Sequence, residues 1–222
     1  ELMQNAHTVI KNKKALLPID DLELEQIAYV QMGDDSGIHF FNTLKKYTNV
    51  KKLSHQNLDD LVLDLKNFST VVVGFHKSNE SPWKPYKFED KELVWLQEIA
   101  RKKEVILDVF ASPYSLLNIK SFTNLEAVLV AYQNSEIAQE ITAQTIFGAI
   151  EASGKLPISI KNEFPVGTGI ITKSLQRLQY SIPEAVGMSS KKLARIDSVA
   201  TVVLEEMMSP GLQVLVARKG VV

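Results

Sequence analysis

Residues 76–86, with the sequence HKSNESPWKPY, combine side chains that suit sugar binding. Trp83 and Tyr86 carry flat rings on which a sugar could stack, and His76 and Lys77 can donate hydrogen bonds to its hydroxyl groups. The competing interpretation is a proline-stiffened surface loop whose aromatic rings pack on a neighbouring domain. We therefore treat these four residues as candidate substrate-binding residues.

A second candidate loop covers residues 33–37, Gly-Asp-Asp-Ser-Gly, between an expected strand and an expected helix. This is the usual position of a phosphate cradle, but the spacing is G-x-x-x-G rather than G-x-G-x-x-G. Asp34 and Asp35 would also repel a phosphate. Because loops at the carboxyl ends of strands bind ligands in open α/β sheets, both aspartates remain candidate substrate-binding residues.

Buried strands and amphipathic helices alternate along the part of the chain that must position these loops. Nearly continuous apolar runs predict four strands and a weaker fifth, and the segments between them have helical spacing. The predicted strands are 26–32, 50–54, 70–75, 105–110 and 127–132; the predicted helices are 38–47, 58–68, 90–102 and 136–150, the last capped by Ser135. The alternation predicts an α/β fold, a three-layer αβα sandwich with a mainly parallel, flavodoxin-like sheet.

The two ends of the chain have different patterns. Leu2, Ala6, Val9 and Ile10 have helical spacing, so a helix is expected at the amino end. Prolines and glycines in 155–183 favour an extended tail that wraps the domain and becomes a linker. An amphipathic helix capped by Ser189 and a terminal strand at 212–222 should follow, and both ends look cut from a longer polypeptide.

Composition excludes several classes of function. The 222 residues include no cysteine and have a net charge of -1, which excludes a thiolate nucleophile and gives no electrostatic case for nucleic acid. No apolar run is long enough for a transmembrane helix. The four histidines lack metal-ligand spacing, so neither a metal nor a cofactor is expected.

Three further residues invite a chemical role but have structural interpretations. Ser189 and Lys192 match Ser-x-x-Lys, although Ser189 is better explained as a helix cap with exposed lysines beside it. Asp108 interrupts an apolar run, and we expect it near the sheet edge or bound by backbone donors, since an unpaired buried carboxyl is costly. None of the three is assigned a catalytic role.

Three segments, taken in order, carry a family resemblance. The first segment is NAHTVIKNKKALLPI near the amino end, and the second is EVILDVFASPYSL. The third runs from Val130 to Ile160 and contains VAY, IFGAI and GKLPISI. Together they resemble the C-terminal domain of glycoside hydrolase family 3. The resemblance covers residues 1–172 as a domain, and members acting on β-N-acetylglucosamine or β-glucose look most similar. Ser112 stands where the family often has Asn, and Gln133 where it often has an acid.

A second resemblance begins after a linker at 173–188. Residues 189–222, with the few residues before them, contain the segments PEAVGMSSKKLARIDSV and SPGLQVLVARKGVV. These segments resemble the first helix and strand of serine β-lactamase and penicillin-binding-like domains. The nucleophile of that fold lies in a later Ser-x-x-Lys motif, which this chain does not reach. The expected parent is thus a fusion of a glycosidase and a truncated β-lactamase-like domain.

The resemblance implies a supporting role in a retaining β-glycosidase. Such enzymes need two carboxyl groups about 5–5.5 Å apart, and in this family the Asp nucleophile belongs to a preceding barrel domain. No catalytic residue is therefore assigned here, although Glu80 and Glu89 are the candidates if this domain supplies the acid. The implied partners are that barrel and a carbohydrate, and the resemblance favours export.

Other interpretations stay open. The chain could be a flavodoxin-like module for a nucleotide or flavin, or a purely structural or carbohydrate-binding domain. The terminal strand, without its own domain, should pair with a sheet edge and could form a dimer, or else be disordered.

Overall fold

A computed structural model describes every residue except 1, 24–25, 79–82 and 84. The chain forms two compact units, Glu1–Leu175 and Gln176–Val222.

The first unit is built on a six-stranded sheet with the order β1-β6-β5-β4-β2-β3. Five strands are parallel, and β1 joins the edge antiparallel to β6. The strands are β1 Thr8–Asn12, β2 Ile27–Gly33, β3 Val50–Leu53, β4 Thr70–His76, β5 Glu104–Phe110 and β6 Ala127–Val130. The five strands predicted from apolar runs are confirmed, and their parallel order matches the flavodoxin-like pattern.

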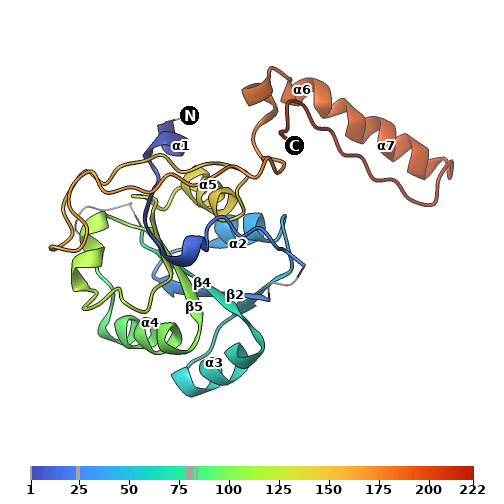
Figure 1. Cartoon of the computed structure of the whole chain (residues 1–222). Helices are drawn as coiled ribbons and strands as arrows, with labels where there is room; N and C mark the ends of the chain where they lie inside the picture. Colours follow the sequence, from blue (N-terminus) through green and yellow to red (C-terminus); the bar gives the residue numbers. More distant parts are fainter. Residues whose placement is uncertain (1, 24–25, 79–82, 84) are drawn as a thin grey trace. The chain divides into compact units, whose positions relative to one another are not determined.

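Helices cover both faces of this sheet (Figure 1). On one face, α2 (Ile38–Leu44) and α5 (Glu136–Ile146) bury apolar side chains against the strands. On the other face, α3 (Leu58–Asp64) and α4 (Asp90–Lys102) do the same. Short 3-10 turns, η1 Lys13–Ala15, η2 Leu65–Asn67 and η3 Pro113–Asn118, complete the unit. The predicted three-layer sandwich is therefore the observed fold.

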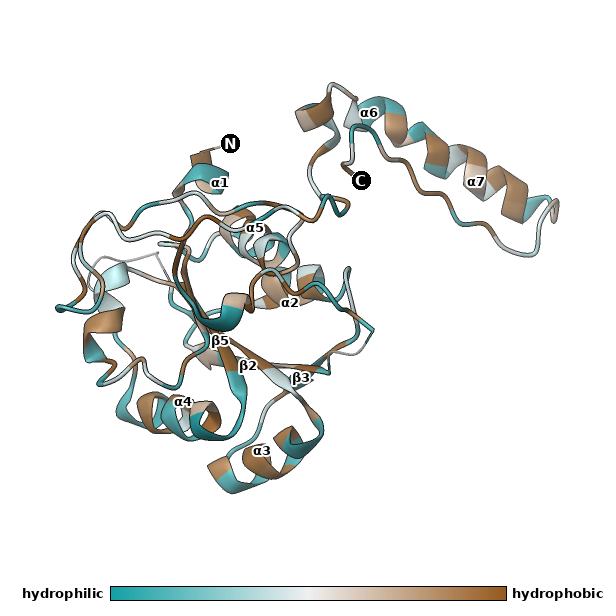
Figure 2. Ribbon diagram, viewed as in Figure 1, coloured by the Kyte–Doolittle hydropathy of each residue, from teal (hydrophilic) through white to brown (hydrophobic). Residues whose placement is uncertain are grey.

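Sequence signals explain where the longer helices begin. Ser135 accepts a hydrogen bond from the Ala138 amide, which confirms its predicted role as the cap of α5. Helix α4 has Asp90 and Glu92 in its first turn and two basic residues in its last, the distribution that complements the helix dipole. In Figure 2 the central strands are largely brown, whereas α4 carries brown and teal on different faces.

The amino end differs from the prediction. Helix α1 covers only Leu2–Ala6, and Val9 and Ile10 belong to strand β1 instead. Both side chains are buried, because β1 pairs with β6 and thereby covers an otherwise open sheet edge. Tertiary pairing has overridden the local helical spacing here.

The tail after α5 wraps the first unit as predicted. The Ile170 amide donates to the Val9 carbonyl at 2.8 Å, and the Leu175 amide donates to the Gly148 carbonyl at 2.7 Å. These bonds hold the extended chain against β1 and against the end of α5. The unit boundary after Leu175 lies three residues beyond the predicted domain end at 172.

The second unit contains η4 Pro183–Val186, α6 Ser190–Leu193 and α7 Arg195–Glu205. Ser189 accepts from the Lys192 amide at 3.4 Å, as expected for a cap. The expected terminal strand is wrong for this structure, since 212–217 has no strand assignment and only isolated bridges involve Arg218 and Val221. Residues 212–217 make no strand-ladder hydrogen bonds within the described chain. Pairing of this segment with another chain stays a prediction.

No helix in the described part of the chain combines the length and apolar character needed to cross a membrane.

Candidate functional site

The candidate site lies at the carboxyl ends of β2 and β4, where the strand order reverses. These two strands are neighbours in the sheet, with Gly33 opposite His76, but their chains continue to opposite faces. Open α/β sheets bind ligands at such a switch point. The loops that follow these strands begin at residues 33 and 77. They contain five of the six predicted binding residues, and the sixth, His76, directly precedes the second loop.

His76, the last residue of β4, is fully buried. Its Nε2 is 2.9 Å from the Tyr29 hydroxyl, and its Nδ1 is 2.8 Å from Asn134 Oδ1. The ring also stacks on Phe110, with centroids 4.4 Å apart and planes 6° apart. Gly37 leaves room for this arrangement, since a Cβ there would lie 2.4 Å from His76 Nε2.

The hydrogen-bond directions in this cluster are mutually consistent. Asn134 donates through Nδ2 to the Ser36 carbonyl, so its Oδ1 accepts from both His76 Nδ1 and Gln139 Nε2. His76 Nε2 then accepts from the Tyr29 hydroxyl. Burial, followed by the nearby Asp108 carboxyl, raises the pKa of Tyr29 and keeps that hydroxyl protonated.

Burial lowers the pKa of His76 to about 4, although its bond to Asn134 and the charge of Asp35 act in the opposite direction. The imidazole is therefore neutral near pH 7, and both ring nitrogens are used within the chain. This corrects the prediction that His76 donates to a sugar: it fixes the end of β4 instead. The apolar run at 70–75, which His76 directly follows, was the sequence signal for burial.

Lys77 and Asp34 are brought together across the switch point. Lys77 Nζ is 3.6 Å from Asp34 Oδ2 and 5.5 Å from the centre of the Phe75 ring. The Lys77 side chain is buried, whereas that of Asp34 is 45% exposed. The pair thus places one carboxylate, held by a buried cation, at the solvent-facing rim.

The backbone amides of residues 33–36 already donate to other groups of the chain. Gly33 donates to Glu92 Oε1 at 2.6 Å, and Asp34 and Asp35 both donate to the His76 carbonyl. The Ser36 amide donates to the Asp35 carboxylate. Because a phosphate cradle requires free amides pointing at the ligand, this geometry disfavours the nucleotide interpretation. Glu92, which sequence reasoning missed, accepts the Gly33 amide and so withdraws one of the donors that such a cradle would use.

Trp83 and Tyr86 have exposed rings on the same loop as Lys77. Trp83 is 91% exposed and Tyr86 is 39% exposed. Both rings therefore offer exposed apolar surface. Stacking on a sugar and packing on a neighbouring domain would each require this. Of the two candidate acids, Glu80 lies outside the described residues, and Glu89 is the N-cap of α4, where its amide donates to Glu92.

Asp108 lies in the middle of the sheet, which corrects the expected edge position. It is fully buried on β5, opposite Gly74 of β4, and neither carboxyl oxygen has a hydrogen-bond partner among the described residues. Burial raises the pKa of this carboxyl well above its ordinary value. The group is consequently favoured in its neutral, protonated form, and the predicted backbone donors are not found in the described part of the chain.

No protein-family model matches the chain, and no curated protein matches its sequence. Solved structures share its fold. A fungal multi-domain glycoside hydrolase family 3 β-N-acetylglucosaminidase, described with a GCN5-related glucosamine N-acetyltransferase region, has 23% identity and a TM-score of 0.58, covering 72% of this chain and 18% of its own. A Listeria innocua β-glucosidase in complex with isofagomine has 18% identity and a TM-score of 0.58, covering 69% of this chain and 25% of its own.

A β-glucoside phosphorylase gives a comparable match, with 17% identity and a TM-score of 0.56 over 72% of this chain and 30% of its own. At these identities the comparison establishes a shared fold. The chain spans between about a fifth and a third of these three proteins.

Proposed function

We propose that the first unit is the non-catalytic α/β domain of a retaining β-glycosidase that hydrolyses terminal β-linked N-acetylglucosamine or glucose. The observation that carries the proposal is the shared fold with much longer carbohydrate-active proteins. The sequence resemblance at 1–172, which does not depend on that fold, supports the same interpretation. In this proposal the domain stabilises a catalytic barrel and lines part of its sugar site.

The rim of the switch point is the surface proposed to face the sugar. Asp34 is exposed and held by Lys77, while Trp83 and Tyr86 supply exposed rings. A carboxylate that accepts from sugar hydroxyls beside a stacking ring is a common basis for carbohydrate recognition. Asp35 is included in this rim. His76 is buried, where its bond to Asn134 helps fix the end of β4, and it does not contact the proposed sugar.

Among the described residues, the carboxyl groups of Asp34 and Glu89 already have structural partners rather than facing each other as a catalytic pair. Asp34 is bound to Lys77, and Glu89 is the N-cap of α4. Two carboxyls that act on one glycosidic bond must face each other across it. We therefore expect the chain by itself to hydrolyse neither aryl β-N-acetylglucosaminides nor aryl β-glucosides.

The first test is the coding sequence that precedes Glu1. A barrel domain with an Asp nucleophile would support the proposal, and an unrelated upstream domain would overturn it. The second test is turnover of the two aryl glycosides by this chain, with an active family 3 enzyme as the positive control. Turnover by the chain alone would contradict the non-catalytic role.

The contribution of the rim is tested in the parent enzyme. Trp83→Ala and Asp34→Asn should raise KM more than they lower kcat, because they remove contacts to the bound sugar. Glu98→Gln on α4, where Glu98 pairs with Arg101, is the matched surface control. Unchanged kinetics in both rim variants would limit this domain to a structural role.

For the second unit, we propose the opening helix of a serine β-lactamase or penicillin-binding-like domain. Its support is the sequence resemblance and the capped α6–α7 segment. The coding sequence after Val222 tests this directly, since a Ser-x-x-Lys motif should follow downstream.

A further inference from the structure

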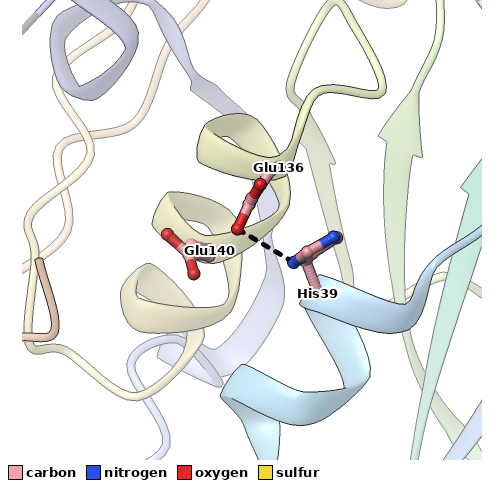
Figure 3. Close-up of side chains that lie close together, drawn as sticks. All are labelled: His39, Glu136 and Glu140. Atoms are coloured by element: carbon pink, nitrogen blue, oxygen red, sulfur yellow. Dashed lines mark ion pairs between the residues drawn. The ribbon is translucent and has the colours of Figure 1, made fainter.

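The amino-terminal halves of α2 and α5 bring one histidine and two glutamates together (Figure 3). His39 lies on α2, and Glu136 and Glu140 lie on successive turns of α5. One ligand atom from each side chain lies within 4.8 Å of the other two. We propose that these three side chains form a binding site for a divalent transition-metal ion of the zinc type.

The existing geometry is close to a metal coordination shell. His39 Nδ1 is 3.2 Å from Glu136 Oε1. Ligands about 2.0–2.2 Å from a tetrahedral zinc ion are about 3.4 Å from one another, so this pair already has the required separation. The ligand atom of Glu140 lies within 4.8 Å of the other two, so this carboxylate must move closer on ion binding, and water would complete the shell.

The charges of the cluster favour a cation. Glu136 and Glu140 are four residues apart on α5, where like charges repel each other. Among the described residues, no lysine or arginine forms an ion pair with either glutamate, and His39 pairs with Glu136 alone. A divalent ion would neutralise both carboxylates and would bind the neutral imidazole as well.

The backbone that carries the ligands is held by a buried side chain. Gln139, next to Glu140, accepts from the Phe40 amide at 3.0 Å and donates to the Ser36 carbonyl at 2.9 Å. Phe40 is next to His39, so this single amide group joins α2 to α5 beside the three ligands. The ligand side chains themselves reach solvent, with 43% of His39 and 62% of Glu136 exposed. An ion can therefore enter a scaffold whose main chain is already in place.

The ligand types select the metal. Imidazole nitrogen together with carboxylate oxygen suits zinc and its transition-metal neighbours, whereas calcium and magnesium prefer shells made of oxygen alone. Three protein ligands leave one open position. We expect zinc to bind and magnesium to compete poorly.

Calorimetry and equilibrium dialysis of the full chain with zinc chloride test the site. The expected result is one ion per chain, with binding weakened at least tenfold by His39→Asn and by Glu140→Gln. X-ray absorption of the zinc-loaded chain should show one imidazole nitrogen and otherwise oxygen ligands. Zinc should also raise the urea midpoint of the unsubstituted chain more than that of either variant.

His55→Asn is the matched control. His55 also pairs with a carboxylate, with Nε2 3.0 Å from Asp64 Oδ2, but the described residues place no third ligand beside them. This substitution should leave zinc affinity unchanged. The proposal is overturned if no stoichiometric binding occurs, or if His39→Asn and Glu140→Gln bind zinc as tightly as the unsubstituted chain while circular dichroism shows all of them folded.

Discussion

Both units contain an amphipathic helix, but the apolar face of that helix is buried to a different extent in each. In the first unit, α4 buries Leu96 and Ile99 against a sheet that is itself covered on both faces. In the second unit, α7 has no buried residue, and its apolar stripe of Ile196, Ala200 and Val203 is only half-buried. The difference teaches that helical periodicity predicts an apolar stripe but not what covers it. A sheet supplies the partner surface in one unit, and the 176–222 segment supplies none of comparable size.

The largest expected difference comes from deleting apolar side chains in each unit. Leu96→Ala should lower the free energy of unfolding by about 2–5 kcal/mol, because it leaves a cavity in a closed core. Val199→Ala should change it by less than about 0.5 kcal/mol, because that side chain is largely solvated. Urea denaturation followed by circular dichroism measures both. Equal losses would mean that the exposed face of α7 is covered in solution.

Acid should destabilise the first unit through His76. The folded pKa is about 4 and the ordinary value is 6.5, so the unfolded chain takes up the proton first. The stability linked to neutral His76 is present above pH 6.5 and is lost as the pH falls towards 4, by about 3 kcal/mol. His76→Asn should reduce this pH slope, measured by urea midpoints between these values. An unchanged slope would assign the acid sensitivity to another group.

Removing the donor to His76 tests the same buried cluster without changing its titratable ring. Tyr29→Phe should cost about 1–3 kcal/mol, because it leaves the Nε2 of a buried imidazole without its hydrogen-bond donor. Tyr114→Phe, at an exposed ring in the same unit, is the control. Equal small effects from both would show that the Tyr29 hydroxyl adds little to stability.

Asp108 should respond to pH in the opposite direction from His76. Its folded pKa is raised, so the folded chain retains the proton longer, and stability is lost as the pH rises above the ordinary value of 3.8. Asp108→Asn, which stays neutral, should stabilise the unit at pH 7, because it removes the free energy that the unfolded chain gains by ionising this carboxyl. The gain should shrink towards pH 4. Destabilisation at pH 7 would instead indicate an ionised, hydrogen-bonded carboxylate.

The smallest expected effect compares the two serine caps. Ser135→Ala should lower the global stability of the first unit by about 1 kcal/mol, since it removes the acceptor for the Ala138 amide. Ser189→Ala should leave that global value unchanged and speed hydrogen exchange only within α6 and α7. Exchange followed by mass spectrometry separates the two outcomes. A global loss from Ser189→Ala would show that the units unfold together.

Local pattern predicted the sheet well because its strands are buried on both faces. Runs such as Val71-Val72-Val73 require cover on each side, and only a layered fold supplies it. The same reasoning failed at Val9 and Ile10, where β6 offered an edge to pair with. The spacing of neighbouring residues carries no information about the free edge of a strand that lies more than a hundred residues away in the sequence.

The candidate site was predictable in position but not in the roles of its residues. Strand ends located the loops at 33 and 77, yet the burial of His76 depends on Gly37, Tyr29 and Asn134, which come from three other segments. The exposed rings of Trp83 and Tyr86 agree with both interpretations of that loop. Distinguishing contact with a ligand from support of the backbone required knowing which hydrogen bonds were already made.

By itself, the order of residues determined the alternation of strands and helices, the helix caps and the lack of cysteine chemistry, because these depend on neighbours within a few positions. Tertiary structure alone decided that Asp108, in a central strand, has no hydrogen-bond partner among the described residues, and that His39 lies beside Glu136 and Glu140. Both outcomes depend on which segments pack side by side. Packing joins residues about a hundred positions apart, a distance over which helical and strand periodicities carry no information.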